Sequence, residues 1–146
     1  MQLHDLVNRR IRDVQEAFGV VLPLTWEVGP WPHFNKPRGF GVTLQKHHGG
    51  PCVVRLSKKL LLAPDHRKDG IIRHELGHVV DILSNGVELE KWALRRGVRL
   101  PPKEQGELRA DAIAHAIWGT VLLYELPYFI QSTLRGVTPR PVSLGL

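Results

Sequence analysis

His74, Glu75 and His78 are polar side chains within a largely apolar stretch that extends from residue 71 to residue 83. The apolar residues recur with the spacing of a buried helix, which we expect to run from about Lys68 to Ser84. Residues four apart lie on one face of a helix, about one turn apart. His74 and His78 therefore point the same way, and two imidazoles at that spacing can bind one metal ion.

Glu75 directly follows the first of these two histidines. Its carboxylate can reach a water molecule bound to the metal without being a ligand itself. His-Glu-x-x-His is the pattern typical of zinc metallopeptidases, in which both histidines bind zinc and the glutamate is the general base. The sequence thus predicts Zn²⁺ as the cofactor, His74 and His78 as ligands and Glu75 as the catalytic residue.

A second pair of residues at helical spacing, Glu107 and Asp111, follows about thirty residues later. Glu107 can complete a site of two histidines and one glutamate, which leaves the fourth position of the zinc open for water. Asp111 is then placed to accept the free N–H of a ligand histidine, which raises the basicity of that histidine. His115 is an alternative third ligand, although a lone histidine on a helix is more often a packing or surface residue.

These two motifs resemble those of the gluzincins, and most of all those of the small ImmA/IrrE-type metallopeptidases. His74 to His78 matches the first motif, and Glu107-x-x-Ala110-Asp111-x-Ile113-Ala114 matches the second, with Ile113 where that family usually has Phe. The resemblance covers the central forty-five residues or so. It implies a zinc-dependent endopeptidase with Glu75 as general base. The substrate would be a protein or peptide, and regulatory DNA-binding proteins are among the candidate substrates.

The rest of the chain predicts a short β region between helices. We expect a first helix over about residues 4–19 and a connecting helix over about 88–96. The helix that carries the second motif should span about 103–119, and a last helix about 122–134. The strand candidates are Thr25–Val28, Gly39–Gln45 and Cys52–Leu56. This order predicts an α+β, minimal zincin-like domain with a small N-terminal mixed sheet, an active-site helix and a helical C-terminal half. Gly39–Gln45 is either an edge strand that pairs with an extended substrate or a plain hairpin arm.

Length and composition are those of one globular domain, spanning residues 1–146. No apolar run approaches the eighteen or so residues of a membrane span, and the first residues do not form a signal peptide. Cys52 is the single cysteine, so no internal disulfide is expected and a cytoplasmic location is predicted. We expect Cys52 to be a small core residue.

The net charge of +6 raises the alternative of a basic nucleic-acid-binding module. The basic residues are scattered over several segments, without a nucleic-acid motif or interleaved aromatic residues. We therefore expect a solvated basic surface, no direct nucleic-acid role and no membrane association.

The sequence leaves open which residue stabilises the oxyanion of the tetrahedral intermediate, with Tyr124, Tyr128 and His115 as the nominees. It also leaves a second class of function, a catalytically silent protein that keeps zinc as a structural ion in an interaction or assembly role. The presence of Glu75 favours the peptidase, because a structural metal site needs ligands but no general base.

Overall fold

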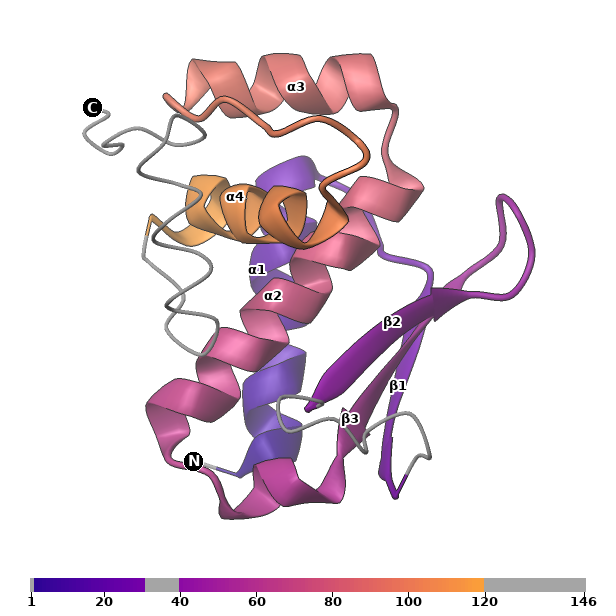
Figure 1. Cartoon of the computed structure of the whole chain (residues 1–146), viewed down its shortest axis with the longest axis vertical. Coiled ribbons are helices and arrows are strands. Elements are labelled where there is room, and N and C mark those ends of the chain that lie inside the picture. Colours follow the sequence, from indigo (N-terminus) through magenta and orange to yellow (C-terminus); the bar gives the residue numbers. More distant parts are fainter. Residues whose placement is uncertain (1, 31–39, 120–146) are drawn as a thin grey trace.

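The computed structural model describes residues 2–30 and 40–119. Within these residues it contains four α-helices, a short 3₁₀ helix and a three-stranded sheet (Figure 1). In chain order the elements are α1 (Leu3–Phe18), β1 (Leu24–Gly29), β2 (Gly41–Gln45), β3 (Cys52–Ser57), η2 (Lys58–Leu62), α2 (Asp65–Leu83), α3 (Gly86–Arg95) and α4 (Gly106–Trp118). The expected helix over 122–134 lies outside the described residues.

The sheet is mixed, as the sequence predicts, with the strand order β1–β3–β2. The central strand β3 runs parallel to β1 and antiparallel to β2. Opposite residues of an antiparallel pair point to the same face of a sheet. Thr43 of β2 lies opposite Val54, and Gly41 lies opposite Leu56. Gly41 and Thr43 are therefore on the same face of the sheet as Val54 and Leu56.

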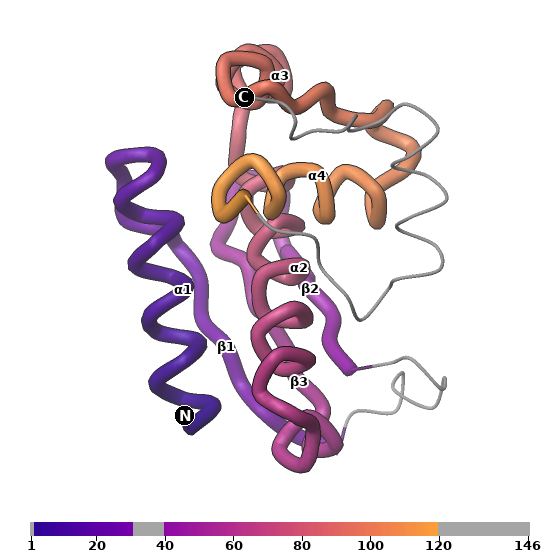
Figure 2. Tube along the Cα trace, turned by 90° about the vertical axis from the view of Figure 1, so that its left-hand side faces the viewer, coloured from indigo at the N-terminus to yellow at the C-terminus, as the bar shows by residue number. Residues whose placement is uncertain are grey.

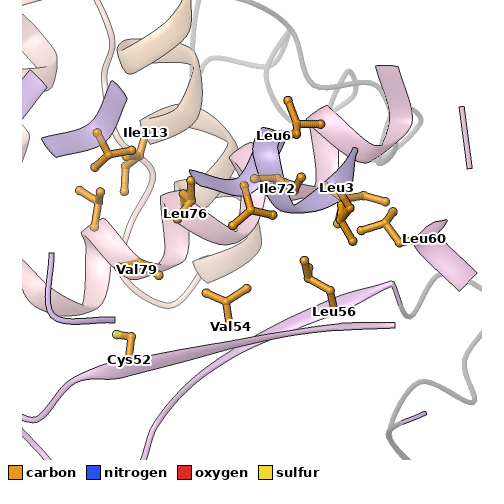
Figure 3. Packing of buried hydrophobic residues seen from close by; sticks show 14 of the residues in the cluster. Leu3, Leu6, Cys52, Val54, Leu56, Leu60, Ile72, Leu76, Val79 and Ile113 are labelled. Atoms are coloured by element: carbon orange, nitrogen blue, oxygen red, sulfur yellow. The ribbon is translucent and has the colours of Figure 1, made fainter. Parts of the chain in front are cut away.

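Helices α1 and α2 pack side by side on that face of the sheet (Figure 2). Alternate residues of β3 point toward them, because side chains alternate between the two faces of a strand. Figure 3 shows these side chains meeting leucine and isoleucine residues from the helices. The cluster includes Leu6 of α1, Val54 of β3 and Ile72 and Leu76 of α2, and the buried Cys52 belongs to it, as predicted.

The chain between α2 and α3 differs in one respect from the sequence-based prediction. Asn85-Gly86 is a helix stop by its composition, and α2 does end just before it, at Leu83. The side chain of Asn85, however, accepts the backbone N–H groups of Val87 and Glu88 and so caps the start of α3. The connecting helix therefore begins at Gly86 rather than at Glu88.

Helix α4 crosses α2 at a close backbone contact. A Cβ atom added to Gly77 would overlap the backbone carbonyl group of Ala110. A glycine inside a helix costs about 1 kcal/mol relative to alanine, and this close approach accounts for it here. Ala110 lies between Glu107 and Asp111, so the contact at Gly77 sets how far these two acidic residues are from the histidines of α2.

Arg109 links α4 to its neighbours from a fully buried position. Its Nε donates a hydrogen bond of 3.0 Å to Asp81 of α2, and its Nη1 donates one of 2.7 Å to the carbonyl oxygen of Pro101. A longer ion pair of 3.4 Å joins it to Glu90 of α3.

Across the described residues, no helix has both the length and the apolar character needed to cross a membrane.

Candidate metal centre

Two histidines of α2 form one side of the candidate site. His74 is almost fully buried and His78 partly so. Their rings meet edge to face, with centroids 4.7 Å apart. This proximity follows from the four-residue spacing, which places both side chains on the face of α2 that meets α4.

Glu107, in the first turn of α4, brings a carboxylate to both imidazoles. Its Oε1 lies 2.9 Å from Nε2 of His74, and its Oε2 lies 3.1 Å from Nε2 of His78. One ligand atom from each of the three residues lies within 4.8 Å of the other two. His74, His78 and Glu107 therefore form a group that could hold a metal ion.

The donor atoms of this group suit a divalent transition metal. Two imidazole nitrogens and one carboxylate oxygen are ligands that zinc and related ions accept. Bonds of about 2.1 Å in a tetrahedral site separate neighbouring ligand atoms by about 3.4 Å. The two nitrogen–oxygen separations around Glu107 are only a few tenths of an ångström shorter than this.

Asp111, one turn after Glu107, contacts the other nitrogen of His74. Its Oδ1 lies 2.6 Å from Nδ1 of His74, and both side chains are about 1% exposed. Burial by itself lowers the pKa of His74, but the hydrogen bonds to Asp111 and Glu107 outweigh it and raise the pKa well above the usual value. With its Nδ1 proton directed to Asp111, His74 presents Nε2 toward Glu107.

The carboxyl group of Glu107 is held in its ionised form. Hydrogen bonds from His74 and then from His78 lower the pKa of Glu107 far below its usual range, against the opposing effect of partial burial. A carboxylate must be deprotonated to bind a metal, so this environment keeps Glu107 in the form that a ligand requires.

The side chain of Glu75 lies between α2 and the edge strand β2. Its side chain is buried, with the residue 4% exposed. The hydroxyl group of Thr43 donates a hydrogen bond of 2.7 Å to its Oε1. Glu75 is not part of the group of three ligand candidates found among the described residues.

Sequence reasoning missed Thr43, Gly41 and Arg109. Gly41 and Thr43 are two apart on the expected strand and so share a face, but nothing in the sequence indicates that this face meets Glu75. Arg109 lies between Glu107 and Asp111, and its complete burial could not be inferred from a charged residue on a helix.

Of the three nominees for oxyanion stabilisation, only His115 lies within the described residues. His115 is buried in the last turn of α4 and is not part of the group of three ligand candidates found among the described residues. Tyr124 and Tyr128 lie outside the residues that the structure describes. His47 and His48 are exposed in the turn between β2 and β3.

The comparisons of this chain with protein-family models, with curated proteins and with solved structures found no match. The gluzincin resemblance therefore stays a prediction made from the two motifs.

Proposed function

We propose that this chain is a zinc metallopeptidase that hydrolyses peptide bonds, with His74, His78 and Glu107 as ligands and Glu75 as general base. The observation that carries the proposal is that three ligand candidates from α2 and α4 converge beside the buried carboxylate of Glu75. Thr43 of β2 holds this carboxylate by a hydrogen bond. A site that only binds metal has no use for that separate carboxylate.

The ligand set favours zinc with one open coordination position. Three protein ligands of the His, His, Glu type are found in catalytic zinc sites, where water takes the fourth position. The chemistry that zinc supplies when bound is activation of this water and polarisation of the scissile carbonyl. Asp111 supports the site by orienting His74, as carboxylates do for many ligand histidines.

In the proposed reaction Glu75 moves the proton. Its carboxylate accepts a proton from the attacking water and later donates it to the amine that leaves. Strand β2 lies at an edge of the described sheet, and its outer side is suited to pair with an extended peptide through backbone hydrogen bonds. We propose a protein or peptide substrate for this reason, with regulatory DNA-binding proteins as the first candidates because of the resemblance to ImmA/IrrE-type peptidases.

The arrangement of elements also supports a zincin-like assignment. A small sheet, a helix with the first motif packed against it and a second helix that brings Glu107 are the parts expected of a minimal zincin-like domain. In Figure 1, α4 lies across α2 on the side away from β1, where it can deliver its acidic residues to the histidines.

The variant Glu75→Gln tests this function. It is nearly isosteric and changes no ligand, so we expect it to keep the fold and the zinc content of the wild type. An amide cannot accept the proton of the water, so peptide hydrolysis should be almost abolished. The exposed Glu88 of α3 provides a matched control, because Glu88→Gln makes the same chemical change away from the site.

The measurements are zinc content, thermal melting and cleavage of a broad set of proteins, including DNA-binding regulators. Cleavage by the wild type and by Glu88→Gln but not by Glu75→Gln, with all three holding zinc, supports the peptidase. Undiminished cleavage by Glu75→Gln contradicts the mechanism. Absence of cleavage by every zinc-loaded form, across the whole set, favours the catalytically silent protein with a structural zinc.

A further inference from the structure

We propose that Gly41 and Thr43 of the edge strand β2 form a seat that fixes the direction of the Glu75 carboxylate toward the metal site, with Thr43 as a positioning residue. This inference rests on the proposed function, because it assigns Glu75 the role of general base. It concerns a different property, namely how a glutamate side chain with three rotatable bonds is held ready for that role.

Thr43 holds one oxygen of the carboxylate. Its Oγ1 lies 2.7 Å from Oε1 of Glu75 and 3.2 Å from the main-chain oxygen of the same residue. A hydroxyl group has one hydrogen, and the shorter contact to an ionised oxygen is the stronger of the two. The second contact keeps the threonine side chain close to α2. Oε1 is thus engaged, and Oε2, which Thr43 does not reach, is left to accept the proton.

Gly41, on the same strand as Thr43, limits the space available to the carboxylate of Glu75. A Cβ atom at this position would lie 3.1 Å from Cγ and 3.2 Å from Oε2 of Glu75. These contacts are tighter than ordinary van der Waals contacts, so only a glycine leaves enough room for the carboxylate as it stands. The backbone of β2 at Gly41 therefore forms a wall of the seat, while Thr43 provides the hydrogen bond.

The register of the sheet explains why both residues reach Glu75. Gly41 and Thr43 lie opposite Leu56 and Val54 of β3, two buried residues on the face that α2 covers. Their side of β2 is therefore directed toward α2, beside the helix turn that carries Glu75. The strand proposed to bind substrate would then also position the general base.

Prior positioning of the carboxylate matters for catalysis. A general base must be within hydrogen-bond reach of the proton that it takes. A misplacement of about 1 Å can lower a rate by about a hundredfold. The alternative is a purely structural contact, in which Thr43 only satisfies a buried carboxylate. If Thr43 positions Glu75, loss of its hydroxyl group weakens the binding of a ligand at the metal. If the contact is only structural, ligand binding at the metal does not change.

Acetohydroxamic acid can measure this effect without a known substrate. Its hydroxyl oxygen binds zinc and shares its proton with a carboxylate beside the metal. We would determine its affinity, the affinity for zinc and the melting temperature for the full chain and for five variants. These are Glu75→Gln as reference, Thr43→Val, Thr43→Ser, Gly41→Ala and the control Thr25→Val, which makes the same change on the exposed side of β1.

We expect Glu75→Gln and Thr43→Val each to weaken hydroxamate binding by about tenfold, the usual effect of one hydrogen bond to a charged group. Gly41→Ala should weaken it by a smaller factor, because the carboxylate must shift by only a few tenths of an ångström. Thr43→Ser, which keeps the hydroxyl group, should bind like the wild type. Thr25→Val should also match the wild type, and zinc affinity should be the same in all forms.

Several results would overturn the proposal. If Thr43→Val bound the probe like the wild type while Glu75→Gln did not, the seat would be wrong and the peptidase proposal would stand. If Thr43→Ser failed to restore binding, the effect of Thr43→Val would be structural and not due to the hydroxyl group. If Glu75→Gln bound the probe normally, or the wild type bound no zinc or no hydroxamate, both this inference and the proposed function would fall.

Discussion

Nδ1 of His74 lies 2.6 Å from Oδ1 of Asp111, and both side chains are almost completely buried. This contact joins α2 to α4 at the point where the candidate ligands meet. A carboxylate bonded to one imidazole nitrogen fixes the tautomer of the ring and increases the basicity of the other nitrogen. We therefore expect Asp111 to orient His74 toward a metal ion bound at the other ring nitrogen.

The first prediction separates the ligand Glu107 from the supporting residue Asp111. Asp111→Ala should weaken zinc binding by about 10–100-fold, the usual loss for such a supporting carboxylate. Glu107→Ala should weaken it further, because it removes a coordinating atom, and His74→Ala or His78→Ala should abolish stoichiometric binding. Titration with a competing zinc chelator measures all four. A larger loss for Asp111→Ala than for Glu107→Ala would make Asp111 the ligand.

The second prediction concerns the contact between Gly77 and α4. Gly77→Ala places a methyl group against the backbone carbonyl of Ala110, which cannot rotate away. We expect a loss of about 2–3 kcal/mol in the free energy of unfolding, at the upper end of overpacking effects. Zinc affinity should also fall, since α4 must move with Glu107 and Asp111.

Gly106→Ala is the matched control for this change, measured by the same chemical denaturation. A Cβ atom at Gly106, the first residue of α4, meets no other atom within 4 Å. Its stability should equal or slightly exceed that of the wild type, because alanine restricts the unfolded chain. Equal stabilities of the two variants would refute the close contact.

The third prediction concerns the buried Arg109. Arg109→Met keeps much of the side-chain volume but leaves Asp81 without its charged partner and the carbonyl of Pro101 without this donor. Removing one partner of a buried ion pair costs about 3–5 kcal/mol. Denaturant unfolding should show this loss, whereas Arg95→Met on the exposed side of α3 should change stability by no more than about 0.5 kcal/mol. A similar, small effect of both variants would argue against a structural role for Arg109.

The fourth prediction is a dependence of stability on pH through Asp69. Burial alone would raise the pKa of this carboxyl, but hydrogen bonds from Arg10 and Arg73 outweigh it and lower the pKa below the usual value of 3.8. The folded state therefore binds the proton more weakly than the unfolded state. The stabilisation is complete above the unfolded pKa and is lost as pH falls through the lower, folded pKa.

The variant Asp69→Asn tests the direction of this pH dependence. We expect the variant to be less stable than the wild type at neutral pH by about 2 kcal/mol, the contribution of a hydrogen bond to a charged group. The difference should shrink as the pH falls below about 4, where the wild-type carboxyl also becomes neutral. Both proteins lose other ionised contacts in acid, so the comparison of the two isolates Asp69. A difference that stays constant down to pH 2 or so would contradict the prediction.

Much of the fold follows from local patterns in the sequence. Helix α1, expected over residues 4–19, covers Leu3–Phe18, and all three strand candidates form strands whose ends differ from the expected ones by at most two residues. Such elements depend on the spacing of apolar residues and on glycine and proline, which act over a few residues. The start of α3 at Gly86 was missed because Asn85-Gly86 can end one helix or cap the next.

Within the site, the sequence alone determined which residues lie together on each helix. A pitch of about 3.6 residues places His74 beside His78, and Glu107 beside Asp111, whatever surrounds them. Only the tertiary structure decided that these two pairs meet, since this depends on α4 crossing α2 at Gly77 with Arg109 anchored in the core. It also decided that Thr43 reaches Glu75, because the register and packing of β2 involve contacts between residues far apart in the chain, which local spacing does not specify.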